Sequence, residues 1–533
     1  MDQPAGDEST ARYTGSRFLS PIADTVGLRI DQFNFLVTET LALIFAMCFR
    51  HFLPPKSNNT LPRHLVDKIL SILASLLGIA LCHFCYGSQI WHIIVQSSVV
   101  YLILYSVHPK HSHLVVFVFC MAYLSAGKLL LKQLTIRNLI YCLVHIYRII
   151  YDYGNSTIDI SASLMINTQK LTALAFAFYD GYRSTQRARR RRPDEDDEHT
   201  ALNEDQEKQK IIDIPKPIEY LSYIFYFQGI CVGPLCFFKD YCDFIEGRNL
   251  LVIPTSGTID KSNDEQYQLS QIKQPSIFWP VFTKILQCSM WGYIFLAYAP
   301  YYPLEYNLSQ EIINSSFFKR VWILVISIFC FRVKYYCAFI LSEAVNNAAG
   351  LGFNGFDKNG IPRWDLLTNV KPLQIELGTS LKVVLDVWNI QTALWLRRVC
   401  YDRLPKGRTL GVFVISAFWH GFYPGYYVSF ILAAFQTYAG RGIRRQIRPY
   451  FQKNQTTKYI YACITWLGTQ IGLYFIVTPF ILLEIRKAWY FYKSWYFIVP
   501  IVSIILALVL NGASSKPKKK QKSSQGKERK TSN

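Results

Sequence analysis

Two short polar stretches in an otherwise apolar and aromatic region carry the residues best suited to chemistry. His420 lies within Ser416-Ala-Phe-Trp-His-Gly-Phe-Tyr-Pro-Gly-Tyr-Tyr427, and Asn389 lies within the earlier stretch Trp388-Asn-Ile-Gln-Thr-Ala-Leu-Trp-Leu396. A lone imidazole in such surroundings is costly to desolvate unless a partner or a function uses it. We therefore interpret the two stretches as parts of one buried reaction site.

The spacing of the two stretches predicts that they meet. We expect one helix over residues 388–403, a break over 405–407 that contains Pro and Gly, and a second helix from residue 409 onward. At 1.5 Å per residue, Asn389 would lie about 21 Å from the break and His420 about 17 Å back along the returning helix. An antiparallel hairpin would then place both side chains at nearly the same depth.

The chemistry that this pair suggests is acyl transfer. A neutral imidazole can take a proton from an alcohol, and an amide can orient the substrate or donate to a developing oxyanion. Ser416 precedes His420 by four residues, so on a continuous helix it shares that face and can fix the imidazole tautomer. The alternative is that His420 is a packing histidine bonded to a neighbouring helix.

The composition indicates a membrane protein, because 51% of the 533 residues are hydrophobic, 15% are aromatic and only 17% are charged. We predict an all-α polytopic membrane protein with roughly 10–12 transmembrane or re-entrant helices around an intramembrane reaction chamber. The candidate segments are residues 33–49, 65–86, 89–107, 114–131, 137–151, 161–179, 217–238, 278–300, 320–342, 409–434, 457–484 and 492–511.

Charge and polarity divide the chain into five parts. We expect a disordered tail, an N-terminal membrane block, a charged cytosolic linker, a C-terminal membrane block with the catalytic site, and a basic cytosolic tail. Their boundaries are 1–30, 31–182, 183–215, 216–512 and 513–533.

The net charge of +21 is concentrated in a few basic runs, which we interpret as cytosolic segments that face anionic lipid headgroups rather than nucleic acid. The 13 cysteines are scattered through apolar stretches without the spacing of metal ligands or of a disulfide framework. Three histidines in residues 108–113 and the turn at 350–362 lack the companion ligands of a metal site. We predict no metal site and no bound cofactor.

The two stretches resemble the paired signature of the membrane-bound O-acyltransferase family, in its lysophospholipid branch. The resemblance extends over most of the membrane region, including residues 151–154, 169–171, 179–181, 229–234 and 346–368. It implies a multi-pass enzyme of the endoplasmic reticulum that moves a fatty acyl group from acyl-CoA to the free hydroxyl of a lysophospholipid. It also implies that His420 is the catalytic base, that Asn389 is its partner, and that long-chain acyl-CoA is a co-substrate.

The candidate substrate-binding residues are polar or aromatic neighbours of this pair, namely Trp388, Gln391, Thr392, Trp395, Arg397, Ser416, Trp419 and Tyr423. The arginine suits CoA phosphates on the cytosolic side, or alternatively a snorkelling anchor. The tryptophans suit the wall of an acyl tunnel, although packing between helices would leave the same pattern.

Three acceptor lipids fit the resemblance: lysophosphatidylethanolamine and lysophosphatidylserine first, and then lysophosphatidylcholine. The rival functions are acylation of a protein or a neutral lipid within the same family, and lipid transport or scrambling. A transporter also shows broken helices and intramembrane polar residues, but it does not require one Asn/His pair, and it usually has two corresponding halves.

The C-terminal tail gives the first testable prediction. Lysines recur from Lys516 to Lys527 with no acidic residue between them, directly after an apolar run. Such a segment should lie in the cytosol against anionic headgroups. Protease added to sealed microsomes should therefore remove a C-terminal epitope tag. A protected tag would reverse the predicted topology, and truncation after Ser515 should preserve acyl transfer.

Overall fold

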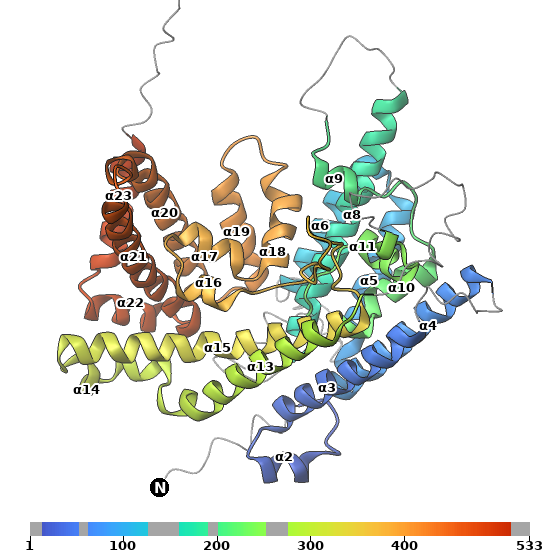
Figure 1. Ribbon diagram of the computed structural model, residues 1–533, viewed down its shortest axis with the longest axis horizontal. Helices are drawn as coiled ribbons and strands as arrows, with labels where there is room; N and C mark the ends of the chain where they lie inside the picture. Colours follow the sequence, from blue (N-terminus) through green and yellow to red (C-terminus); the bar gives the residue numbers. More distant parts are fainter. Residues whose placement is uncertain (1–12, 53–61, 126–158, 190–200, 252–274, 513–533) are drawn as a thin grey trace, which may run out of the picture.

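The computed structural model describes residues 13–52, 62–125, 159–189, 201–251 and 275–512. The described part of the chain is helical, and its extended pairing is limited to two isolated bridges, Phe356 with Pro362 and Val370 with Trp388. The predicted all-α class is confirmed (Figure 1).

The N-terminal block begins earlier than the sequence indicates. Its helices are α2 (Ser20–Val26), α3 (Ile30–Phe52), α4 (Arg63–Tyr86), α5 (Trp91–Ser106), α6 (Pro109–Ser125) and α8 (Ser161–Arg189). The Tyr13 hydroxyl donates to the carbonyl of Cys85 at 2.5 Å, and the Thr14 hydroxyl donates to that of Tyr86 at 2.7 Å. The expected disordered tail of residues 1–30 is thus ordered from residue 13, because its hydroxyls satisfy carbonyls at the end of α4.

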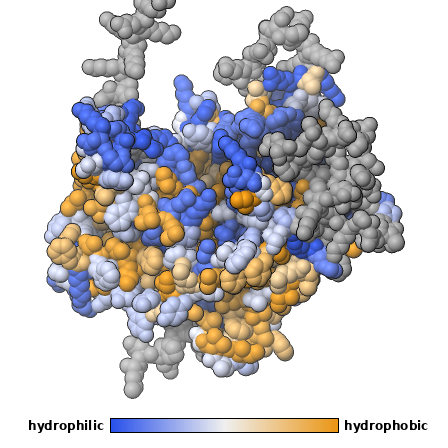
Figure 2. All heavy atoms as spheres, viewed as in Figure 1, coloured by the Kyte–Doolittle hydropathy of each residue, from blue (hydrophilic) through white to orange (hydrophobic). Residues whose placement is uncertain are grey.

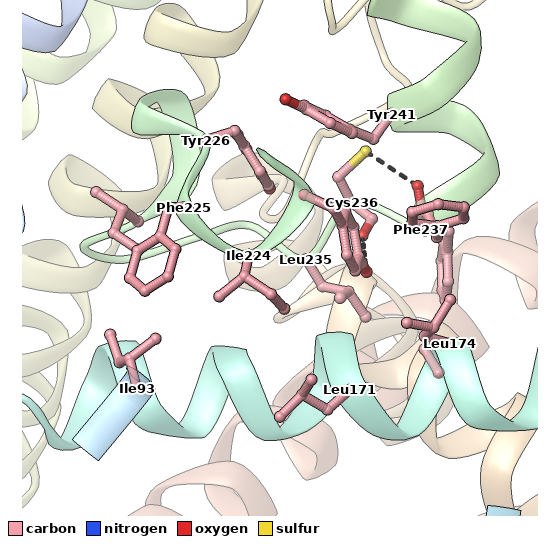
Figure 3. Close-up of a cluster of buried hydrophobic side chains, with 14 of the residues drawn as sticks. Ile93, Leu171, Leu174, Ile224, Phe225, Tyr226, Leu235, Cys236, Phe237 and Tyr241 are labelled. Carbon is pink, nitrogen blue, oxygen red and sulfur yellow. Dashed lines mark hydrogen bonds between the residues drawn. The ribbon is translucent and has the colours of Figure 1, made fainter. Parts of the chain in front are cut away.

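Helix α8 lies at the centre of the larger hydrophobic core. Leu171 and Leu174 on α8 face Ile224 and Leu235 of the following segment (Figure 3). Beside them the Lys170 ammonium, itself buried, donates to the carbonyl of Ile224 at 3.0 Å. A buried lysine thereby satisfies carbonyls at the end of a short helix.

The candidate bilayer segment at 217–238 is not one helix. Helix α10 (Pro217–Phe225) ends after nine residues and is followed by the 3₁₀ turn η3 (Phe227–Gly229) and an irregular stretch up to α11 (Phe238–Ile245). Nine residues span only about 14 Å, too little to cross a bilayer. Helix α10 ends before Gly229, and the backbone stays irregular through Gly233 and Pro234. It is buried within the protein, where such irregularity is tolerated.

The expected linker at 183–215 is largely part of the fold. Helix α8 continues to Arg189, and α9 (Glu204–Gln209) starts with a capping box between Asn203 and Gln206. The Asp205 carboxylate of α9 receives two hydrogen bonds of 2.6 Å from the Arg398 guanidinium. Polar composition predicted a solvated loop, whereas specific charge pairing attaches the second half of the segment to the C-terminal block.

The C-terminal block consists of four long helices, α13 (Phe278–Tyr298), α15 (Phe317–Ala349), α20 (Pro424–Gln446) and α21 (Gln455–Leu482), and a group of shorter ones. The shorter helices are α14 (Gln310–Ile313), α16 (Pro372–Glu376), α17 (Leu381–Val387), α18 (Ile390–Leu396), α19 (Arg408–His420), α22 (Ile485–Ser494) and α23 (Ile498–Gly512). Helix α15 packs against α13 and against α3, so it joins the two blocks (Figure 1). Helices α20, α21 and α23 pack together at one end.

Four helical stretches of the described chain are long and apolar enough to cross a membrane, and a pair bent by 89° would make a fifth. They are Ile30–His51, His64–Ser106, Phe317–Ala349 and Gln455–Leu482, and the bent pair is Ile485–Ser494 with Ile498–Leu510. Hydrophilic residues gather along the upper edge of the molecule and hydrophobic residues over its lower part (Figure 2). The multi-pass prediction holds, but several of the predicted 10–12 segments are shorter or broken, and 137–151 lies outside the described residues.

A buried ion pair attaches the C-terminal block to α8. The Arg403 guanidinium bonds both carboxylate oxygens of Asp180, at 2.7 and 2.6 Å. The Asp180 side chain is only 4% exposed, so the pair is screened from water. Removing one partner would leave the other charge buried and unpaired.

We therefore predict that Asp180→Asn lowers the stability of the detergent-solubilised protein by about 3–5 kcal/mol, seen as a large fall in Tm. The control is Asp386→Asn, which breaks the exposed pair of Lys382 and Asp386 and should change stability by about 0.5 kcal/mol or less. Equal shifts for both variants would show that the buried pair does not hold the two blocks together.

Candidate active site

The two polar stretches form one helical hairpin. Helix α18 and a π-helical turn, η7 (Arg397–Tyr401), make the first limb, and the 13 residues of α19 make the second. Asn389 immediately precedes α18, and His420 is the last residue of α19. Limbs of similar length joined by residues 402–407 place Asn389 and His420 at the same end (Figure 1). This supports the expectation that the two residues lie at one depth.

The depth of this end follows from the basic turn at the other end. Lys406 and Arg408 lie at or beside the turn and are exposed, as expected for residues at the headgroup level. Helix α19 then runs about 20 Å before it ends at His420. The hydrocarbon core is about 30 Å thick, so a basic turn at the headgroup level corresponds to a His420 within the apolar layer.

Aromatic rings enclose the imidazole of His420. The ring centroids of Phe480, Phe430 and Tyr426 lie 5.0, 5.5 and 5.7 Å from its own, and that of Trp419 lies 4.7 Å away. These side chains come from three helices, α19, α20 and α21. The partly buried imidazole thus lies against a largely apolar wall.

The backbone breaks directly after His420. Gly421 has φ 120°, which ends α19, and Pro424 starts α20. The apolar run at 409–434, expected as one bilayer helix, is therefore two helices. His420 therefore lies at the C-terminal end of α19.

Asn389 occupies an unusual backbone position. Its φ of 55° and ψ of 57° are left-handed, a conformation that Asn tolerates better than most residues. Its side chain makes no capping hydrogen bond to α18. Instead Asn369 accepts from the first helical N–H groups, through its carbonyl from Ile390 at 2.8 Å and through its side chain from Gln391 at 3.1 Å. The partly exposed amide of Asn389 therefore remains available to a substrate.

Several candidate substrate-binding residues instead fasten the hairpin to α8. Thr392 accepts a hydrogen bond of 2.9 Å from Gln169, the Trp395 indole donates to Thr172 at 2.9 Å, and the Trp419 indole donates to the carbonyl of Met165 at 3.2 Å. Each of these contacts is buried or largely so. Thr392, Trp395 and Trp419 are thus held against α8 by these hydrogen bonds.

Two further candidates position the start of α18. Gln391 donates its amide to the carbonyl of Leu366 at 2.9 Å, which fixes the preceding loop. Trp388 is extended rather than helical, and its ring packs on Tyr335, Tyr336 and Phe339 of α15. The helix predicted from Trp388 thus begins two residues later, at Ile390.

Ser416 and Tyr423 lie on either side of His420 in the chain and are both buried. Ser416 is one turn earlier on α19, and Tyr423 is the residue before α20, with its ring 5.6 Å from that of Tyr426. Both therefore belong to the immediate surroundings of the imidazole.

The arginines of the hairpin have different roles. Arg398 is paired with Asp205 and lies 3.5 Å from the Phe237 ring, whereas the Arg397 side chain is 59% exposed. Burial raises the pKa of the Asp205 carboxyl, but the hydrogen bonds and charge of Arg398 outweigh it, so that the pKa lies below its usual value. Arg397 lies 3.5 Å from the Asp402 carboxylate, and with the exposed Lys406 and Arg408 it makes the surface of this turn basic.

Sequence reasoning missed Asn369 and three rings of the His420 enclosure. Tyr426 and Phe430 are spaced by four residues on one helix, a signal that was present in the sequence. Phe480 lies 60 residues beyond His420, and nothing local indicates their contact. Within the described ranges, no group of three His, Cys, Asp or Glu side chains is placed to hold a metal ion.

The chain matches proteins of known family over most of its length. Residues 146–481 match the model of the membrane-bound O-acyltransferase family. The chain is 38% identical over 513 residues to membrane-bound glycerophospholipid O-acyltransferase 2 of Rattus norvegicus, which covers 96% of this chain and 91% of that protein. It is 35% identical over 510 residues to the human protein named membrane-bound glycerophospholipid O-acyltransferase 1. This match covers 95% of this chain and 94% of that protein. A Schizosaccharomyces pombe lysophospholipid acyltransferase is 31% identical over 379 residues, 69% of each chain.

The close contact between α20 and α21 beside His420 gives a structural prediction. A Cβ on Gly425 would stand 2.1 Å from the carbonyl oxygen of Pro479, so Gly425→Ala must push α20 away from α21. We expect a clear fall in Tm for the purified protein. Gly440→Ala on the same helix meets nothing within 4 Å and should be neutral or stabilising by up to about 1 kcal/mol. An equally harmless Gly425→Ala would refute the tight packing around His420.

Proposed function

The chain belongs to the membrane-bound O-acyltransferase family, and from this premise we propose that it transfers a fatty acyl group from acyl-CoA to the free hydroxyl of a lysophospholipid. The observation that supports the proposal is the placement of Asn389 and His420 at the same end of one helical hairpin. The relatives named for glycerophospholipid and lysophospholipid acylation support the choice of acceptor.

The proposed reaction is a direct transfer with His420 as the base. The imidazole takes the proton of the lysophospholipid hydroxyl as the hydroxyl oxygen attacks the thioester carbonyl carbon. The C–S bond then breaks, and the CoA sulfur leaves with the proton from the imidazolium. The Asn389 amide donates a hydrogen bond to the oxyanion that forms between these steps. No acyl-enzyme is needed.

Access to the site is proposed from two directions. The exposed Arg397, at the basic turn, is the candidate contact for CoA phosphates, because an arginine pairs well with phosphate oxygens. The lysophospholipid would enter from the bilayer. We also propose an endoplasmic-reticulum location with the basic tail in the cytosol, for which the charge distribution of the chain is the support.

We propose lysophosphatidylethanolamine or lysophosphatidylserine as acceptor, with lysophosphatidylcholine as the next choice. The deciding experiment is acyl transfer by the purified protein across a panel of lysophospholipids and acyl-CoAs, with a sterol, a diacylglycerol and a peptide as competing acceptors. Transfer to a non-phospholipid acceptor alone would assign another function of the same family. Lipid movement across vesicles without any transfer would assign a transporter.

In this assay we predict that His420→Ala lowers turnover by roughly 10²-fold or more, because it removes the general base. Asn389→Ala should be similarly severe, and Asn389→Gly should be as inactive although glycine suits the left-handed backbone. An Asn389→Gly variant with near-normal turnover would show that the backbone and not the amide is needed. A His420→Ala variant that keeps more than about a tenth of turnover would contradict the assignment of the base.

A further inference from the structure

The last turns of α15 carry polar side chains that are buried without satisfying their hydrogen-bonding capacity. Glu343, Asn346 and Asn347 are each 0–1% exposed. In the described chain, Glu343 Oε2, Asn346 Oδ1 and both side-chain amide atoms of Asn347 have no hydrogen-bond partner. A buried polar atom left unpaired costs about 1–3 kcal/mol, so several in one place point to a polar ligand.

One donor group lies beside these acceptors, and a second belongs to the loop that follows α15. The Lys284 ammonium is 2.9 Å from Glu343 Oε1, and the buried indole N–H of Trp364 has no partner among the described residues. Asn347 faces the loop that carries Trp364, because a Cβ on Gly352 would stand 1.8 Å from Asn347 Oδ1. We call Lys284, Glu343, Asn346, Asn347 and Trp364 the α15 polar cluster.

Hydrogen bonds connect the α15 polar cluster to the start of the Asn389/His420 hairpin. The Thr368 hydroxyl donates to Glu343 Oε1 at 2.6 Å. The next residue, Asn369, caps α18, and Gln391 holds the same loop through the carbonyl of Leu366. The cluster therefore lies on the Asn389 side of the site, separated from it by one loop, within reach of the far end of a substrate bound there.

The chemistry of the cluster matches a zwitterion. Three oxygen acceptors, Glu343 Oε2, Asn346 Oδ1 and Asn347 Oδ1, need N–H or O–H donors from a ligand. The Lys284 ammonium and the Trp364 N–H can donate to phosphate oxygens. A phosphate ester that carries a primary ammonium group supplies both halves. A trimethylammonium group has the charge but no N–H to donate.

We propose, on the basis of the function proposed above, that the α15 polar cluster binds the head group of the acceptor lipid and selects phosphate esters with a primary ammonium. Glu343 and the two asparagines receive the ammonium, and Lys284 with Trp364 holds the phosphate. This fixes the lipid so that its hydroxyl lies at the hairpin end.

The test is a ratio of kcat/KM values for lysophosphatidylethanolamine and its N-methyl, N,N-dimethyl and trimethyl counterparts, with the same acyl chain and donor. The ratio does not depend on the fraction of protein that is folded. In the wild type, kcat/KM should fall with each added methyl group. The unmethylated and trimethylated lipids should differ by about tenfold or more, which corresponds to the loss of one charged hydrogen bond. Glu343→Gln and Asn347→Ala should each remove most of that discrimination.

The matched control is Glu376→Gln, which breaks another largely buried ion pair. Glu376 pairs at 2.6 Å with Arg332, which lies on α15 about three turns before Glu343. It should lower stability but leave the ratio unchanged. Equal kcat/KM values for the four lipids in the wild type would overturn the inference. So would Glu343→Gln and Asn347→Ala variants that keep the full ratio. Neither result would contradict acyl transfer itself.

A second readout covers variants that fail to fold and separates this inference from the proposed function. The Tm of the wild-type protein in detergent should rise more with lysophosphatidylethanolamine than with lysophosphatidylcholine at equal concentration. If no lysophospholipid is acylated, the proposed function fails, but a preferential Tm rise would still support the head-group site. Equal Tm shifts with both lipids would overturn it.

Discussion

The site depends on how the N-terminus of α18 is satisfied inside the protein. A helix start leaves N–H groups without partners, and within a membrane water does not supply them. Asn369 accepts hydrogen bonds from the N–H groups of Ile390 and Gln391. The isolated bridge between Val370 and Trp388 holds the two chain segments next to each other. Because another residue caps the helix, the amide of Asn389 is left for a substrate. A left-handed backbone at Asn389 follows from the same arrangement.

The hairpin is held against α8 and, through Arg398, against α9. Polar contacts to Thr392, Trp395 and Trp419 act along its length, and charge pairs at Arg398 and Arg403 act at its basic end. Such contacts fix the depth and rotation of both limbs, which a purely apolar interface would leave less determined. The aromatic side chains around His420 add an apolar surface beside the imidazole.

The sequence revealed the hairpin because its signals are local. Pro405 and Gly407 mark the break, and the polar residues stand out against an apolar background, so the common depth of Asn389 and His420 could be predicted from helix geometry alone. The roles of the tryptophans could not, because an indole that packs between helices and one that lines a tunnel have the same sequence pattern. Only the partners on α8 distinguish them.

Other features depend on contacts between residues far apart in the chain. Charge composition at 183–215 predicted a solvated linker, but the pairing of Asp205 with Arg398 joins residues separated by nearly 200 positions. The apolar run at 217–238 looked like a bilayer helix, since hydropathy does not show that irregular backbone is buried against α8. The α15 polar cluster was hidden for the same reason: its members come from α13, α15 and a loop.

The account stands on Asn389 and His420 acting together on one substrate. The most direct measurement is a double-mutant cycle in kcat/KM with Asn389→Ala, His420→Ala and the double variant, all in the same lipid and donor. Groups that serve one transition state are strongly non-additive, so the double variant should be little worse than the worse single variant. Losses that multiply, so that the double variant falls by the product of the two single effects, would show that the residues act independently and would contradict a joint site.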